Sequence, residues 1–342
     1  MTLLRRSLLQ MPIVAALAEP AFAQASDMAA VTAAALKQGK LNLQHNIPPP
    51  LGDLWVAEFQ KAFPAIAVEP TRLPSTEMMQ RFGTEYPAGA SQADLVITLW
   101  DDTLLKWSDA GWLRTWTPPE AAALAPNYKI RDQIYITQFN RSCLLSSKTK
   151  IKDADAPKEW TDFFDPKWKD KIGMDPPWRS VAVQQMLAVW DQQGMKDVAK
   201  RLKANGVKFF NGSAGVVQAT IRGDIWVAAV IDPPVITALN DDAPLRAIFP
   251  ASGVPAVGTG IMMPVKCPHP EAGMVFLNWA LSMQGQKALL ETAGSPVTRP
   301  GAGSPKSVAG VDGQKIVLSS DLLTPAKQKA IIDEWRSVFG LQ

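Results

Sequence analysis

Residues 40–63 read KLNLQHNIPPPLGDLWVAEFQKAF, and this stretch decides the class of fold. Leu41 and Leu43 alternate with polar neighbours, which is typical of a β-strand, and the three prolines that follow end the strand. Trp55 and Phe59 then fall on one face of a 3.6-residue period and predict a helix. A strand followed directly by a helix is the repeating unit of a parallel sheet covered by helices, so the sequence predicts an α/β fold.

Strands and helices continue to alternate along the chain, with one interruption by a segment rich in Trp and Lys at residues 159–172. Strand-helix units before this segment make a first α/β lobe, and the units after it make a second. A helix that Ser75 caps is also expected, and another from Pro270 to Gly294. The other expected strands are 66–68, 94–98, 207–210, 225–231 and 261–265, and the other expected helices are 103–110, 180–193, 195–204, 213–222 and 325–338.

The composition of the 342-residue chain narrows the classes of function. Its 35 basic and 32 acidic residues nearly cancel, so nucleic acid is not an expected partner. The two His lie far from each other, as do the two Cys, so no zinc-ligand spacing is recognisable, and neither a metal site nor a cofactor is expected. Cys143 and Cys267 could pair in an oxidising compartment or remain buried thiols, and both states stay open.

Residues 1–23 have the layout of a secretory signal peptide. Arg5 and Arg6 precede a short apolar stretch, and Ala21 and Ala23 are the small residues that cleavage before Gln24 requires. The paired arginines are compatible with general or with twin-arginine export. No later apolar run reaches the length of a membrane span, so the mature protein is expected in the periplasm.

Five short segments form an ordered set. They read ADLV (93–96), APKEW (156–160), DPKWKDKI (165–172), HPEA (269–272) and SPV (295–297). Through these segments the chain resembles the solute-binding proteins of bacterial ABC importers, in the branch that includes ferric-ion, thiamine and polyamine binders. The resemblance covers about residues 40 to 300.

The resemblance implies a two-lobed periplasmic-binding-protein fold of type II, with ligand held in a cleft between the lobes. It implies two hinge strands, which cross near residues 138–140 and 253–258. Lobe 1 then comprises residues 24–138 and 254–300, and lobe 2 comprises residues 139–253 and 301–342 with the C-terminal helix. A monomer that delivers its ligand to a membrane permease is expected.

Helix starts at the expected cleft form the first group of candidate ligand residues. Arg179 offers a guanidinium fork to a carboxylate or phosphate, and Ser180 begins a helix whose first N–H groups favour an anion. The others are Asn211 and Ser213 at the next helix of lobe 2, and Ser75 and Thr76 on lobe 1. Ordinary helix capping explains the same serines and asparagine, and both interpretations stay open.

Aromatic and acidic residues form the second group, together with Asn46 at the end of the first strand. Trp100 and Trp178 are candidates for flat walls of the cleft, although most of the 12 Trp must be core. Asp101 and Asp232 would attract an ammonium group or hold backbone N–H groups at the hinge, the role preferred for Asp232. The expected ligand is a small polar, anionic organic solute. A cationic ligand such as a polyamine or a thiamine-like molecule is the alternative.

The positions of the tyrosines and of His45 argue against two other functions, ferric-ion binding and catalysis. The ferric binders of the branch carry adjacent tyrosines where this chain reads Ile231-Asp232-Pro233-Pro234, and Tyr86, Tyr128 and Tyr135 are never adjacent. His45 has no nucleophile motif near it, so it is predicted to be a buried or edge-strand histidine. No acid–base pair is recognisable either, and an enzyme on the same scaffold is kept only as an alternative.

Overall fold

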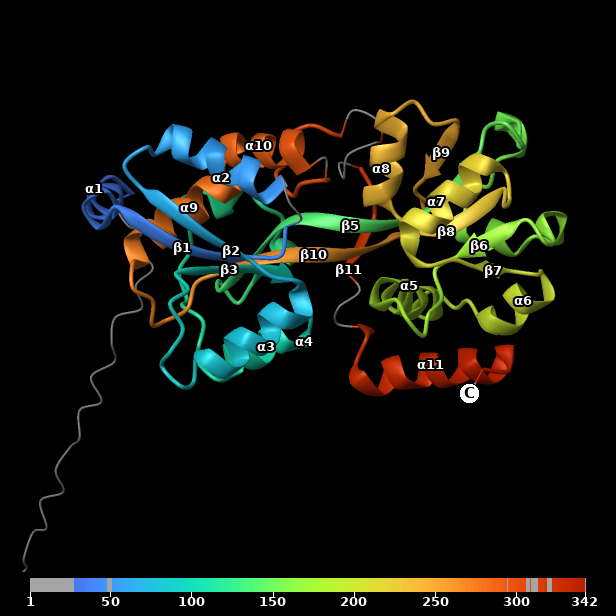
Figure 1. The fold of residues 1–342 in the computed structure, drawn as a ribbon, viewed down its shortest axis with the longest axis horizontal. Helices are drawn as coiled ribbons and strands as arrows, with labels where there is room; N and C mark the ends of the chain where they lie inside the picture. The colour runs from blue at the N-terminus through green and yellow to red at the C-terminus, as the bar shows by residue number, and fades with distance from the viewer. Residues whose placement is uncertain are drawn as a thin grey trace, which may run out of the picture.

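Two long antiparallel strands, β5 (Ile134–Ser147) and β10 (Val254–Met262), run through the middle of the molecule and connect its two lobes (Figure 1). The computed structural model describes residues 28–47, 51–293, 295–305, 308, 313–318 and 322–341. Within them one sheet of eleven strands has the order β2-β1-β3-β10-β5-β8-β6-β7, with β4, β9 and β11 pairing at its sides. The predicted α/β class and the two lobes are confirmed.

Lobe 1 is built on three parallel strands, β1 (Lys40–His45), β2 (Ala67–Arg72) and β3 (Leu95–Leu99). Helices cover both faces of this part of the sheet (Figure 1). One side carries α1 (Met28–Gln38), α2 (Leu51–Ala62), α9 (Pro270–Leu281) and α10 (Met283–Ala293), and the other carries α3 (Ser75–Glu85) and α4 (Asp102–Asp109).

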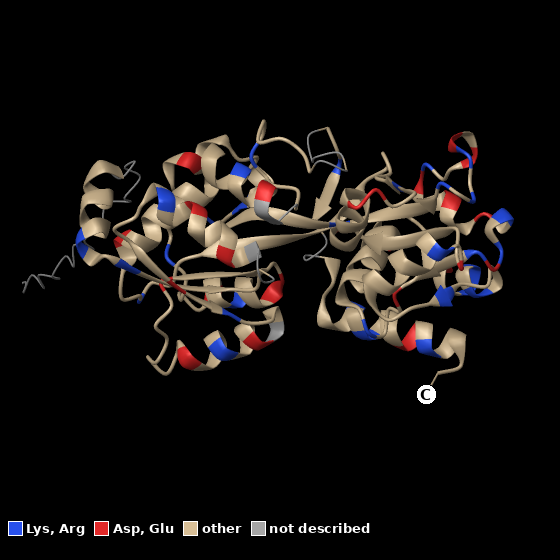
Figure 2. Ribbon diagram, turned by 45° about the horizontal axis from the view of Figure 1, so that its top comes forward, with Lys and Arg blue, Asp and Glu red and all other residues tan. Residues whose placement is uncertain are grey.

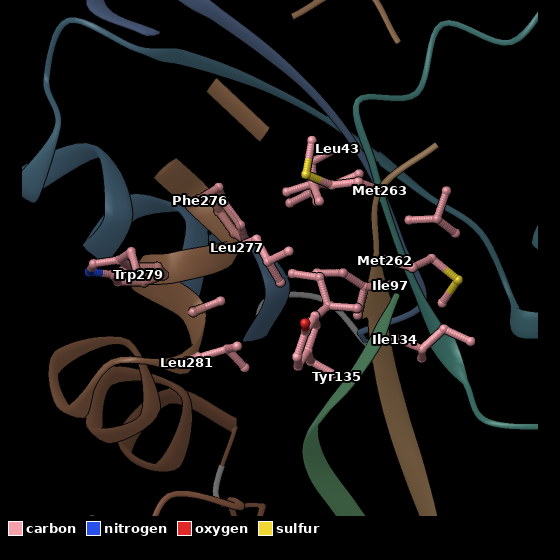
Figure 3. Packing of buried hydrophobic residues seen from close by; sticks show 14 of the residues in the cluster. Leu43, Ile97, Ile134, Tyr135, Met262, Met263, Phe276, Leu277, Trp279 and Leu281 are labelled. Atoms are coloured by element: carbon pink, nitrogen blue, oxygen red, sulfur yellow. The ribbon is translucent and has the colours of Figure 1, made fainter. Parts of the chain in front are cut away.

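The core of lobe 1 joins α9 to the sheet. Phe276, Leu277 and Leu281 point from α9 toward Ile97 and Tyr135 of the strands (Figure 3). All five side chains are buried, and each such residue stabilises the fold by about 1.5–3 kcal/mol through the apolar area removed from water. The helix that the sequence predicted around Trp55 contributes to the same cluster.

The prediction of a single helix from Pro270 to Gly294 is wrong, because two helices, α9 and α10, occupy the described part of that range. Ser282 has extended backbone, and its hydroxyl donates to the carbonyl oxygen of Trp279 at 2.7 Å and accepts from the N–H of Gly285 at 3.1 Å. A Cβ on Gly285 would lie 2.0 Å from that same carbonyl oxygen, so the turn requires glycine. Gly294 lies outside the described residues.

Lobe 2 repeats the layered arrangement with shorter strands. Its strands are β6 (Ile172–Met174), β7 (Lys208–Phe209), β8 (Val227–Ile231) and β9 (Leu245–Ile248). Its helices are α5 (Val181–Gln192), α6 (Val198–Ala204), α7 (Gly212–Arg222), α8 (Asp232–Asn240) and α11 (Pro325–Phe339). The Trp-rich segment before β6 forms short 3₁₀ turns that bury Trp160 and Trp168 in this lobe. Lys and Arg alternate with Asp and Glu over both lobes (Figure 2).

Two small strands complete the sheet. β4 (Lys129–Ile130) pairs with the start of β5, and β11 (Ile316–Leu318) pairs in parallel with Val254–Ala256 of β10. The chain enters the core of lobe 1 at Ala302 and that of lobe 2 at Leu323, so β11 lies on a third passage between the lobes. The resemblance implied two hinge strands, and β11 adds a third beside them.

Candidate functional site

On lobe 2, the candidate residues Arg179 and Ser180 lie at the N-terminus of α5. Ser180 caps the helix, because its hydroxyl accepts from the N–H of Val183 at 3.4 Å, and Arg179 is exposed just before it. Two prolines, Pro176 and Pro177, precede them and cannot donate backbone N–H groups. The first turn of α5 presents backbone N–H groups beside the exposed Arg179 guanidinium, and this arrangement suits an anion.

Asp175 is the functional candidate that sequence reasoning missed. Its carboxylate accepts from the N–H of Gly212 at 3.2 Å and from the hydroxyl of Ser180, which joins the N-termini of α7 and α5. Gly212 has φ +79°, a left-handed conformation that glycine adopts without strain, and this turns its N–H toward Asp175. Burial raises the pKa of the Asp175 carboxyl, against the opposing effects of these hydrogen bonds and of Arg179.

The remaining lobe 2 candidates differ in their surroundings. Asn211 is the N-cap of α7, but its exposed side chain makes no capping hydrogen bond, and Ser213 is half-buried in the first turn. Trp178 packs edge-to-face on Phe209, with ring centroids 4.8 Å apart, at the margin of the lobe 2 core. Asn211 and Ser213 thus flank Gly212 near Asp175, while Trp178 has a packing role.

On lobe 1, Asn46 and Ser75 are in direct contact. The Asn46 amide donates to the Ser75 hydroxyl oxygen at 2.8 Å, where β1 ends and α3 begins. Ser75 is the first residue of α3 and Pro74 holds the N-cap position, so the prediction that Ser75 caps this helix is wrong. The side chain of Thr76 lies outside what the structure describes.

The hydroxyl of Thr98, near the end of β3, is fully buried and lies on the same face of the sheet as Asn46. In the parallel register Gln44 pairs with Val96 and His45 with Ile97, so the next alternation aligns Asn46 with Thr98. Within the described residues neither the Thr98 hydroxyl nor the side-chain amide oxygen of Asn46 (Oδ1) has a hydrogen-bond partner. A buried polar atom without a partner is costly, so these atoms indicate where a ligand or water would bind.

Trp100 and Asp101 belong to the framework of lobe 1 next to the hinge. Trp100 is buried, and its backbone N–H donates to the backbone carbonyl oxygen of Gly258 in β10 at 2.8 Å. Asp101 caps α4 by accepting from the N–H of Thr103 at 2.7 Å. Neither residue contacts the Asn46–Ser75 pair through a hydrogen bond in the described part of the chain.

Comparison with known proteins identifies the family. Residues 55–310 match the model of the bacterial extracellular solute-binding proteins. The chain belongs to this family. A curated Haemophilus influenzae protein described as uncharacterized is 20% identical over 194 residues, covering 54% of this chain and 56% of that protein. The match thus spans little more than half of the length of this curated relative.

Two solved structures share the fold of this solute-binding protein. Iron-bound HitA from Pseudomonas aeruginosa has a TM-score of 0.68 and 21% identity, covering 87% of this chain and 99% of HitA. AfuA from Actinobacillus pleuropneumoniae, with fructose-6-phosphate bound, has a TM-score of 0.68 and 17% identity, covering 89% of this chain and 100% of AfuA. Both likenesses establish the type II periplasmic-binding-protein fold, whose members include substrate-binding proteins of ABC transporters.

Asp232 has no exposed surface in this solute-binding protein. Its carboxylate accepts from the Nε–H of Arg141 and from the Arg141 backbone N–H, both at 2.8 Å. The hinge-holding role that the sequence favoured for Asp232 matches this geometry, and its carboxylate is not free to meet a ligand.

Histidine and cysteine have structural surroundings in the described chain. His45 is buried as predicted, its ring packs against Gly52, and burial lowers its pKa. Cys143 and Cys267 are free thiols, and burial raises the pKa of Cys267 to about 11. No group of three or more His, Cys, Asp or Glu that could hold a metal occurs among the described residues. Their helices include none long and apolar enough to cross a membrane.

Proposed function

We propose that this protein captures a small polar, anionic organic solute between its lobes and delivers it to the membrane permease of an ABC importer. The observation that carries the anionic assignment is Arg179, an exposed guanidinium beside the N-termini of α5 and α7. Across the hinge, Asn46, Ser75 and Thr98 provide uncharged polar groups. These suit the hydroxyl or carbonyl part of an organic anion.

The ligands of the two structural relatives do not support the proposal equally. AfuA binds a sugar phosphate, which combines an anionic group with hydroxyls, and a ligand of this kind would suit the groups on the two lobes. HitA binds iron, whereas this chain holds Ile231 and the buried Asp232 where its resemblance to the ferric binders implies adjacent tyrosines. We therefore favour an organic anion over a metal ion.

A cationic ligand is the second candidate, and Asp175 is the observation that favours it. Its carboxylate already accepts from the N–H of Gly212, a donor that an anionic ligand would otherwise use. An ammonium group could approach Asp175 where an anion would be repelled. Whether the site binds an anion or a cation depends on which charge dominates there, that of Arg179 or that of Asp175.

The proposal extends to location and assembly. We propose an exported, periplasmic monomer without enzymatic activity, and no nucleic-acid partner. Residues 24–138 and 254–300 act as lobe 1 and residues 139–253 and 301–342 as lobe 2, except that Ala302 and β11 pack on the lobe 1 core. The three segments that connect the lobes allow them to close around the solute.

Mass spectrometry of the small molecules released on denaturing freshly purified protein tests this function. We expect an organic acid or phosphate ester, whose readdition to refolded protein raises the melting temperature. A released polyamine or other amine supports the second candidate. If no compound is released and a panel of organic acids, phosphate esters and amines leaves the melting temperature unchanged, the proposed function is wrong.

A further inference from the structure

Basic residues gather at the end of the lobe 2 sheet that lies opposite the candidate site. Val227, the first residue of β8, pairs with Ser146 near the end of β5 and with Ile172 at the start of β6, and β7 starts beside β6. Figure 2 shows Lys and Arg on several turns of this free end. We call it the basic end; its basic residues are Lys148, Lys150, Lys169, Lys171, Lys208 and Arg222, and its acidic residues are Asp170 and Asp224.

Two of these lysines are held beside the turn that connects α7 to β8. Lys208 Nζ donates to the backbone carbonyl oxygen of Asp224 at 3.1 Å. The stem of Lys150 covers Gly223, since a Cβ on this glycine would lie 2.6 Å from Lys150 Cε. The Asp224 carboxylate is already paired with Arg222 at 2.8 Å. In the described part of the chain neither lysine forms an ion pair with a carboxylate, so both ammonium charges remain uncompensated.

A third lysine lies beside Trp226 at the same end. Lys171 Nζ is 5.1 Å from the centre of the half-buried Trp226 ring, a cation–π contact that supplies no counter-charge. Together with Lys150 and Lys208, Lys171 concentrates positive charge around one turn. Such a concentration is unfavourable for the isolated protein because like charges repel, and a negatively charged partner would relieve the repulsion.

The local backbone favours an extended anionic surface over a small anion. α7 ends at this turn with Gly223 as its C-cap, and the C-terminus of a helix presents carbonyl oxygens and a partial negative charge. No cradle of N–H groups is therefore formed there for a single anion. The lysines instead carry point charges on flexible stems, which suit the many phosphates of a lipid surface. A tryptophan beside them is typical of a membrane–water interface.

We propose that the basic end of lobe 2 binds the surface of a membrane that contains anionic phospholipids. Lys150, Lys171 and Lys208 contact the headgroup phosphates, and Trp226 lies at the level of the headgroups. The candidate solute site stays free, because it lies at the opposite end of the lobe 2 sheet. This inference goes beyond the proposed function and holds equally for an anionic and a cationic solute.

Flotation of the purified full chain with lipid vesicles tests the proposal. We expect the protein to float with vesicles of phosphatidylcholine and phosphatidylglycerol in equal parts at about 10 mM salt, where screening is weak. It should not float with vesicles of phosphatidylcholine alone. Raising the salt to about 1 M, where the Debye length falls to about 3 Å, should release it from the anionic vesicles.

A triple variant locates the contact. Lys150→Gln, Lys171→Gln and Lys208→Gln together should lower the partition onto anionic vesicles roughly a hundredfold, because each cation near such a surface contributes about fivefold. All three positions are exposed or half-buried, and thermal melts check that the variant is folded.

A second triple variant is the matched control. It changes three exposed lysines of α2, α4 and α10 on lobe 1, as Lys61→Gln, Lys106→Gln and Lys287→Gln. The control removes the same net charge and keeps the same N-terminal residues, so the two variants differ only in where the charge is lost. Its partition onto anionic vesicles should fall far less than that of the test variant.

Trp226 provides a second readout that only lipid can produce. Phosphatidylglycerol with acyl chains brominated close to the headgroup quenches the fluorescence of tryptophans that contact it. We expect a partial quenching of the wild-type protein, and Trp226→Phe should remove it. A soluble acidic polymer carries the same charge but produces no such quenching.

Any of three results overturns the proposal. The first is absence of flotation with anionic vesicles, or equal flotation with phosphatidylcholine alone. The second is an equal loss in the two triple variants, which means that net charge acts without a localised surface. The third is quenching that Trp226→Phe leaves unchanged, which means that another part of the molecule meets the membrane. Solute binding should be unaffected in the test variant, so these results do not bear on the proposed function.

Discussion

Arg141 and Asp232 form an ion pair in which neither side chain has any exposed surface. The pair connects β5, which passes between the lobes, to the first residue of α8. The Arg141 Nη1–H also donates to Gln314 Oε1 at 2.9 Å, and its guanidinium stacks over the ring of Phe249 at 4.0 Å. One arginine thereby fixes the hinge strand to three other segments of the chain.

Removing one partner of this pair should be strongly destabilising. Asp232→Asn leaves the Arg141 charge buried without its counter-charge, and we expect a loss of about 3–5 kcal/mol in the free energy of unfolding. Urea denaturation measures it, with Asp224→Asn as control, because Asp224 pairs with Arg222 at the surface. Replacing both partners, as Arg141→Met with Asp232→Leu, should cost less than Asp232→Asn. A loss below about 1 kcal/mol in Asp232→Asn would contradict this assignment.

His45 predicts how stability depends on pH. Burial lowers its pKa in the folded protein, while the unfolded chain has the ordinary value of about 6.5. Below that pH the unfolded state binds the proton more readily, so stability should fall as the pH drops from 7 toward 5. In His45→Leu this decline should be smaller, and thermal melts across the range measure it.

The second histidine of the chain is the control for this prediction. His269 bonds the carboxylate of Asp94 at 2.9 Å and lies far from β1 in the sequence. If His269→Gln removes the acid-side decline and His45→Leu does not, the effect assigned to His45 is wrong.

Local periodicity was sufficient to predict most of the fold. The β1 strand and the α2 helix follow from spacing within residues 40–63, and α5, α7 and α11 lie within a residue or two of their expected ranges. The break between α9 and α10 was not predictable, because it depends on the close approach of Gly285 to Trp279. β11 was not predicted because its three residues are too few to show a period.

The candidate site was only partly predictable for a related reason. Ser180 and Asn211 follow from local capping signals, which depend on neighbours a few residues away. The Asp175 contact with Gly212 spans 37 residues, and only the fold brings these residues together. Asp175 follows directly after the short buried strand β6, and a carboxylate at such a strand end was the one signal that could have indicated it.

We predict that the protein does not form the visible tyrosinate–iron band of ferric-binding proteins. The Tyr135 hydroxyl donates to the Trp116 carbonyl at 2.7 Å, and burial raises its pKa, so its phenolate is disfavoured. The Tyr86 hydroxyl oxygen accepts from the Lys266 N–H at 3.1 Å, and Tyr128 packs on Phe139. Absorbance after adding ferric citrate measures the outcome. An intense band that a Tyr→Phe change abolishes would contradict the argument.

Arg179 tests the anion site directly. Arg179→Ala should remove charge-assisted hydrogen bonds worth about 1.5–3 kcal/mol each and weaken binding of the released solute roughly tenfold to several hundredfold. Arg179→Lys should recover only part of the lost affinity, because a single ammonium cannot replace the planar guanidinium. Calorimetric titration measures affinity, with Arg222→Ala as control on an exposed position of the same lobe. Unchanged affinity in Arg179→Ala would remove Arg179 from the site.

Asp175 separates the two ligand classes, because its charge opposes that of Arg179 at the same helix ends. Asp175→Asn keeps an oxygen that can accept from Gly212 but removes the negative charge, so an anionic solute should bind roughly tenfold more tightly. Since burial raises the pKa of this carboxyl, protonation should produce the same gain in the wild type as the pH falls, and the variant should lose that dependence. Titration calorimetry at several pH values measures both effects, and Asp224→Asn should change neither. Weaker binding in Asp175→Asn, together with loss of affinity as the pH falls, would show that Asp175 attracts the ligand and that the solute is a cation.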